Sequence, residues 1–223
     1  MREQYRIELR RLSRDLTEIA RLVHRAILDA RTALESADVH LAQQVISEDA
    51  RIDRLQNTLD EQAVRLLALQ APVATDLRAV VASLRMSASL ERMGDLARHI
   101  AQLTRLRYPE HVLPDCVQEL FARMADAAVE VAEETVMLLD SRDLVHADRV
   151  DAVNTRMNEL HASVFRAIAA PSWTATPATT TDVTLASRYL ERFTDHGVSV
   201  ADKTRYLVTG EWTAHGGPET GRS

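Results

Sequence analysis

The sequence of 223 residues is poor in the residues that mark disulfide-rich and β-rich proteins. It contains one cysteine, six glycines and six prolines, and aromatic residues make up only 4%. The lone cysteine, Cys116, rules out a disulfide framework within the chain and a cysteine-based metal knuckle. Alanine, leucine, valine, glutamate and arginine dominate instead, and these are the residues of long packed helices. We therefore predict an all-α fold.

Negative charge outnumbers positive charge, with 33 acidic against 27 basic residues, and this bears on the partners that the protein can bind. The net charge is −6, and no Lys/Arg run offers the basic surface that nucleic-acid phosphates require. The charged N-terminal stretch 1–12 lacks the apolar segment of a signal peptide, and nowhere do about eighteen apolar residues follow one another. We expect a cytoplasmic protein that binds no nucleic acid and does not cross a membrane.

Apolar residues recur at alternating steps of three and four over long stretches without proline, which indicates amphipathic helices. The segment "YPEHVLPD" at 108–115 contains two prolines and is predicted to separate two halves, and "APSWTATPATTT" at 170–181 is predicted to be a loop. Helices of about 30 residues are about 45 Å long, so each half should be an elongated three-helix bundle. The predicted helices are 3–36, 41–71, 72–107, 115–141, 143–169 and 180–211, in repeats at 1–109 and 113–212 with a disordered tail at 213–223.

A short acidic motif occurs twice, as "LERMGD" at 90–95 and as "LERFTD" at 190–195. Glu91 and Asp95 continue the apolar seam of the third predicted helix, whose earlier members are Leu77, Val81, Leu84 and Ala88. A carboxylate removed from water is costly unless it is paired, protonated or bound to a metal. Something is therefore expected to neutralise Glu91 and Asp95.

The preceding helix adds Asp49 and Asp53, one turn apart. If the two helices are antiparallel, these residues should lie level with Glu91 and Asp95, which would bring four carboxylates together. Such an all-oxygen cluster suits Mg²⁺, Mn²⁺, Ca²⁺ or iron. The alternative is that the acids pair with nearby arginines, which are Arg51, Arg54, Arg78, Arg92 and Arg98.

The second half keeps the spacing but loses part of the charge. Aligning 38–53 with 143–158 places Asn154 opposite Asp49 and Asn158 opposite Asp53. Because Glu191 and Asp195 remain, the second site would have two carboxylates and two neutral amides. We expect it to bind metal more weakly than the first site or not at all.

Catalytic motifs are missing from the sequence. Di-iron bundle enzymes use Glu-x-x-His elements, and no glutamate here is followed by histidine three positions later. There is no P-loop, G-x-S-x-G or dinucleotide fingerprint. His99 and His196 are interpreted as interface histidines, and Met86 and Met93 as core residues. We predict that the chain is not an enzyme.

The rival hypotheses are a carboxylate-cluster metalloenzyme or metal store, and a structural adaptor whose acids are neutralised by arginine.

The segments "PVATDLRAVVASLRMSASLERMGDLARHIA" at 72–101 and "YLERFTDHGVSVADKTRYLVTGE" at 189–211 resemble the PhoU family of regulators of bacterial phosphate uptake. The resemblance extends over residues 3–212 and implies two tandem three-helix bundles that hold metal ions, namely Mg, Mn, Zn or Fe. The sequence departs from the family pattern at Ser89, Thr194, Asn154 and Asn158. The residues that it implies as metal ligands are Asp49, Asp53, Glu91 and Asp95 in the first half and Glu191 and Asp195 in the second.

The same resemblance implies a role and partners. Family members are negative regulators of high-affinity phosphate uptake and of the phosphate-starvation response, the Pho regulon. They are adaptors between the ATPase of the phosphate ABC transporter and a membrane sensor histidine kinase. The resemblance also implies a homodimer that reaches the membrane only through its partners.

Overall fold

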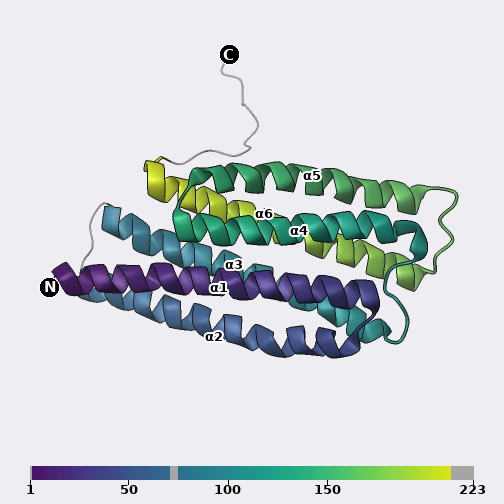
Figure 1. Ribbon diagram of the computed structural model, residues 1–223, viewed down its shortest axis with the longest axis horizontal. Helices are drawn as coiled ribbons and strands as arrows, with labels where there is room; N and C mark the ends of the chain where they lie inside the picture. The colour runs from purple at the N-terminus through teal and green to yellow at the C-terminus, as the bar shows by residue number, and fades with distance from the viewer. Residues whose placement is uncertain (1, 71–74, 212–223) are drawn as a thin grey trace, which may run out of the picture.

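The computed structural model describes residues 2–70 and 75–211, and the tail predicted to be disordered lies outside them. The described residues contain helices but no strands, which confirms the all-α prediction. The helices run lengthwise through an elongated molecule (Figure 1). They are α1 (Arg2–Ser36), α2 (Val39–Gln70), α3 (Thr75–Arg107), α4 (Asp115–Ser141), α5 (Leu144–Ala169) and α6 (Pro177–Thr209).

The start of α6 differs from the prediction, because the helix was predicted to begin at 180 and residues 177–179 are also helical. Thr176 is the N-cap residue, and its side chain accepts a hydrogen bond from the backbone N–H of Thr179. Pro177 follows at the first helical position, where the missing N–H costs nothing and the fixed φ suits a helix. At the other end Gly210 adopts φ +80° and caps the helix, which is the conformation that favours glycine.

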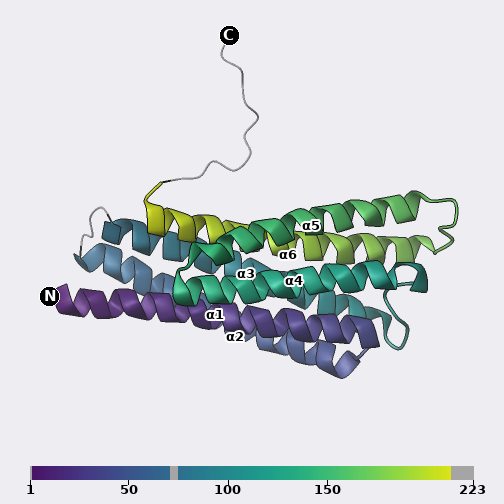
Figure 2. The same cartoon turned by 45° about the horizontal axis from the view of Figure 1, so that its top comes forward.

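The six helices form the two predicted three-helix bundles. Helices α1, α2 and α3 pack against one another, as do α4, α5 and α6. The bundles are joined by contacts of α1 with α4 and of α3 with α6. The flanking helices α2 and α5 lie on opposite outer sides of the molecule (Figure 2).

Helices α3 and α6 are antiparallel neighbours across the junction of the two halves. The hydroxyl of Ser89 lies 3.2 Å from that of Ser199, and the ring of His99 lies 5.2 Å from the ring of Tyr189. These two contacts are equally far from residues 94 and 194, which therefore lie at the same level near the middle of the pair. The two copies of the acidic motif thus lie back to back, as a duplicated bundle would place them.

The predicted core face of α3 is wrong. Leu77 and Ala88 are exposed, whereas Met86, Leu90 and Met93 are fully buried. The reason is that α3 packs against α1, α2 and α6 at once, so its buried face is wide. The predicted series of residues three and four positions apart follows only the edge of that face. Glu91 and Asp95 consequently lie at the rim of the core, while Met86 and Met93 are core residues as predicted.

Candidate functional site

Gly94, within the first acidic motif, sets how closely α2 approaches α3. A Cβ atom at this position would lie 2.8 Å from Cδ1 of Ile52 and 3.3 Å from Oδ1 of Asp49. A larger residue would therefore require the end of the Ile52 side chain to shift. The glycine allows the buried carboxylate of Asp49 to lie directly against the backbone of α3.

Arginine side chains hold the carboxylates of this site. Nε of Arg98 lies 2.5 Å from Oδ2 of Asp49, and Nη2 of the same arginine lies 2.5 Å from Oδ1 of Asp95. Arg92 lies 3.0 Å from Asp95 and 3.5 Å from Glu91. Arg98 thus bridges a carboxylate on α2 and one on α3, in the place between them that a bound cation would take.

The pKa directions show that the four carboxylates lie near enough to influence one another. Burial raises the pKa of Asp49, and Asp53 and Asp95 add to this rise while Arg98 opposes it. Burial likewise raises the pKa of Glu91, and Asp95 and Asp53 again contribute. Burial also acts on Asp95, but Arg98 and Arg92 outweigh it and lower the pKa of that carboxyl. The structure therefore groups the residues that the sequence placed at one level.

The donor set suits a hard cation, but the present side-chain arrangement favours arginine. Among the described residues, no three histidine, cysteine, aspartate or glutamate side chains converge on a point that could hold a metal ion. Oxygen ligands of two helices are nevertheless in place around Arg98, whose side chain is 26% exposed. A metal ion would bind here only after Arg98 turned away from Asp49 and Asp95.

The second half forms a different arrangement, in which a neutral amide and a hydroxyl group take the places of Asp49 and Gly94. Thr194, which replaces Gly94, donates a hydrogen bond of 2.6 Å from its hydroxyl to Oδ1 of Asn154, which replaces Asp49. The two departures from the first half therefore compensate for each other. Asn158 is exposed, Glu191 pairs with Arg188 at 2.6 Å, and Asp195 pairs with Arg192 at 3.4 Å.

His161, which was not predicted from the sequence as a site residue, lies close to this second arrangement. Its Nδ1 is 2.6 Å from the hydroxyl of Ser187. Burial lowers the pKa of His161, although the nearby Glu191 and Asp195 act in the opposite direction. The available signal was its spacing, because His161 follows Asn158 by three residues on the same face of α5.

We expect Thr194→Val to destabilise the protein by about 1 kcal/mol, because it keeps the shape of the side chain but removes the donor to Asn154. Urea unfolding measures the loss. Thr155→Val on the exposed face of α5 is the matched control and should change the free energy of unfolding by less than about 0.5 kcal/mol. Equal losses in the two variants would show that the hydrogen bond to Asn154 contributes nothing specific.

Comparison with known proteins shows that the two halves of the chain match the same domain family. The family profile of the PhoU domain matches residues 16–104 and 121–204, once in each half. The chain is 41% identical over 210 residues to the Mycobacterium tuberculosis phosphate-specific transport system accessory protein PhoU homolog 2, which covers 94% of this chain and 99% of that protein. It is 40% identical over 212 residues to PhoU homolog 1 of Mycobacterium leprae, with 95% and 96% covered.

Solved structures share the same architecture. The crystal structure of PhoU from Pseudomonas aeruginosa superposes with a TM-score of 0.82 at 27% identity, covering 93% of this chain and all of that one. The phosphate transport system regulatory protein PhoU from Streptococcus pneumoniae gives a TM-score of 0.84 at 24% identity over 95% of this chain and all of that one, which shows a shared fold. With both halves matched by the profile and relatives at about 40% identity along nearly its whole length, this chain belongs to the PhoU family.

Proposed function

We propose that this chain is an accessory regulator of a phosphate transport system that holds phosphate uptake and the phosphate-starvation response off when phosphate is plentiful. The observation that carries the proposal is the 41% identity, over 94% of the chain, to a protein named as a phosphate-specific transport system accessory protein. Two relatives from other bacteria, Rhizobium meliloti and Caulobacter vibrioides, have names of the same kind at 28% identity. The similarity on which the proposed role rests therefore extends over both halves of the chain.

In this proposal the protein is a cytoplasmic adaptor and not an enzyme. Its partners are the ATPase of the phosphate ABC transporter and the sensor histidine kinase, and it associates with the membrane only through them as a homodimer. The arrangement of helices supports such a role, because among the described helices α2 and α5 each contact only those of their own half, which leaves their outward faces for partners. Within the described residues, no helix combines the length and apolar character that a membrane span requires.

We further propose that the first-half carboxylates bind a divalent or trivalent ion of Mg, Mn, Zn or Fe. Asp49, Asp53, Glu91 and Asp95 would hold it, and the ion would neutralise their charge and link α2 to α3. The placement of the carboxylates supports this proposal, since one cation, the guanidinium group of Arg98, already lies between Asp49 and Asp95 and would have to turn away before the ion binds. Glu191 and Asp195 would contribute at most a weaker second site.

Deleting the gene tests the regulatory role. In phosphate-replete cells we expect alkaline-phosphatase activity and phosphate uptake both to rise, because the response is no longer held off, and a plasmid copy of the gene should restore low values. Where a paralogue shares the task, the double deletion is the strain to measure. Unchanged activity and uptake in the double deletion would leave the family fold in place and remove the proposed role.

A further inference from the structure

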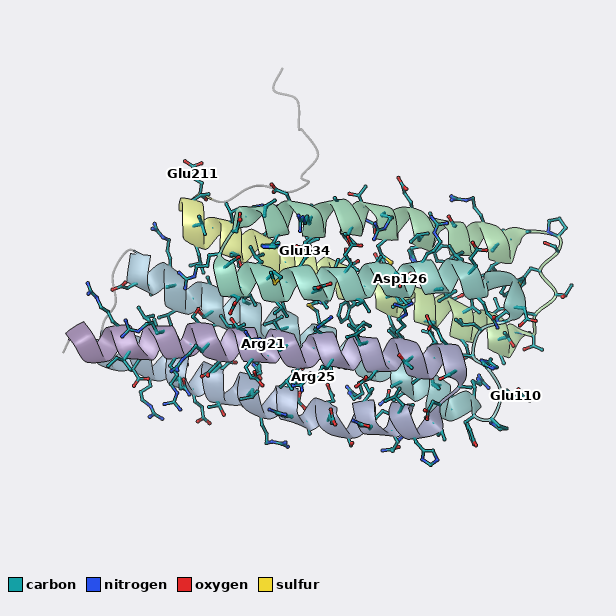
Figure 3. The ribbon with its side chains drawn as sticks, viewed as in Figure 1. Arg21, Arg25, Glu110, Asp126, Glu134 and Glu211 are labelled. Carbon is teal, nitrogen blue, oxygen red and sulfur yellow. The ribbon has the colours of Figure 1, made fainter. Side chains whose placement is uncertain are left out.

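A groove opens where α4 ends and α1 continues past it. It encloses 1140 Å³ and is lined by α1, the beginning of α3, the end of α4 and the end of α6. Figure 1 shows the N-terminal part of α1 extending beyond the end of α4. Figure 3 labels Arg21 on α1, close to that end of α4. The groove lies away from the carboxylate site, since none of the proposed metal ligands lines it.

Arginines gather in this groove although the protein as a whole carries a net charge of −6. Arg6, Arg10 and Arg14 follow one another at single-turn spacing on one face of α1, and Arg21 continues that face two turns further on. The acidic residues Asp15, Glu18, Asp76 and Asp140 also line the groove but are outnumbered. The lining arginines are Arg6, Arg10, Arg11, Arg14, Arg21 and Arg142.

The contacts that these arginines make across the groove are long and exposed. Nη2 of Arg21 lies 3.3 Å from Oδ1 of Asp140, and the two side chains are 51% and 64% exposed. Arg142 reaches Ser13 at 3.4 Å. Arg6 and Arg10 form no salt bridge with any residue that the structure describes. Exposed ion pairs of this kind contribute little to stability, so a ligand that offers better geometry can displace them.

The bottom of the groove is mainly apolar, although the buried polar residues Thr17, Ser83 and Thr204 also line it. Leu16, Met86 and Leu139 are buried core residues that border it, and Leu207 is half-buried. Ile7 lies at the rim and is 43% exposed. A ligand that fits this groove therefore needs an apolar face for the bottom and negative charge for the rim.

We infer that this groove is a docking site for an acidic amphipathic helix of a protein partner. Carboxylates pair well with arginine guanidinium groups, often through two parallel hydrogen bonds. Arg6 and Arg21 are about 22 Å apart along α1 at 1.5 Å per residue, which is the length of about four helical turns. A polyphosphate chain would match the arginines but would leave the apolar bottom without a partner, whereas an amphipathic helix satisfies both parts.

This inference adds a surface to the proposed regulator and is tested independently of it. The probe is a fluorescein-labelled synthetic helix of about 18 residues, with leucines three and four positions apart and glutamates on both sides of the leucine stripe. Its anisotropy is measured at low ionic strength against the full-length protein. One control peptide has the same composition with scattered leucines, and a second has lysine in place of glutamate.

Matched charge variants locate the binding site. Arg10→Glu with Arg14→Glu should weaken binding of the acidic peptide by at least about tenfold, because two charge pairs become repulsive. Arg65→Glu with Arg123→Glu makes the same change in net charge at exposed positions outside the groove and should change the affinity by less than about twofold. Ile7→Ser should also weaken binding, and Arg10→Gln with Arg14→Gln keeps the test valid if the charge reversals unfold the protein.

Three outcomes would overturn the inference. The first is equal loss of binding in both pairs of variants, which would mean non-specific charge attraction. The second is equal binding of the scattered-leucine peptide, which would show that the apolar residues at the bottom of the groove do not contribute to binding. The third is failure of the acidic peptide to bind, and binding of inorganic polyphosphate that is lost in Arg10→Glu with Arg14→Glu would then identify a polyanion site instead. Selective loss of the amphipathic acidic peptide in the groove variants supports the inference.

Discussion

Phe193→Ala should lower the free energy of unfolding by about 3–5 kcal/mol, which is the usual cost of truncating a fully buried phenylalanine. Phe193 is 0% exposed and lies within the second acidic motif, at the position of Met93 in the first. Both residues belong to the central part of the α3–α6 pair, where the two halves of the molecule meet. The variant would therefore weaken the packing of the second bundle and of the junction together.

The cost should lie in the upper part of that range because the surrounding core has little room to collapse. A Cβ atom on nearby Gly197 would lie only 2.3 Å from Cγ1 of Val131 and 3.8 Å from Cε of Met93. Helices this close are already in contact, so they are unable to move inward and fill the volume that the ring vacates. We expect a residual cavity rather than a repacked core.

Urea unfolding followed by circular dichroism measures the effect. An unchanged slope of the unfolding free energy against urea concentration would indicate that the variant still unfolds in one step. Phe165→Ala is the control, because Phe165 is 48% exposed on α5. It should cost no more than about 1 kcal/mol. Similar losses of unfolding free energy in the two variants would contradict the prediction that Phe193 is a central core residue.

Much of the fold follows from the periodicity of apolar residues, because long helices bury a continuous stripe whatever their neighbours are. The face that α3 buries does not follow from it, since the number of neighbours around a helix is a property of the whole fold. The start of α6 was missed for a more local reason. The pair Thr176-Pro177 fits the N-cap and first position of a helix, but it stands in a stretch rich in proline and threonine that was interpreted as a loop throughout.

The candidate site divides in the same way. The spacing of Asp49 and Asp53 against Glu91 and Asp95 was enough to place the four residues at one level. The bridging role of Arg98 was not visible, because five arginines were available and the choice among them depends on side-chain conformations. The pairing of Thr194 with Asn154 was also missed, although the sequence showed both departures, since their contact depends on the distance between α5 and α6.

Arg98→Met should make the protein less stable without metal and allow the carboxylates to bind one. Removing the arginine leaves Asp49 buried without its partner, which should cost about 3–5 kcal/mol in the presence of a chelator. The same change removes the cation that competes for Asp49 and Asp95. Added Mn²⁺ should therefore restore stability, by about 2.7 kcal/mol at a concentration one hundred times its Kd.

Unfolding midpoints measured with EDTA and with MnCl₂ test both parts of this prediction, and isothermal titration calorimetry gives the affinity. Arg92→Met is the control, because its side chain is 62% exposed and its loss should change stability by less than about 1 kcal/mol. Adding Asp49→Asn and Glu91→Gln to Arg98→Met should abolish the recovery with Mn²⁺, since the ligands are then missing. If Arg98→Met is destabilised but Mn²⁺ restores nothing, the carboxylates serve only as partners of arginine. The first half of the chain would then resemble the second, where neutral and paired side chains occupy the same positions.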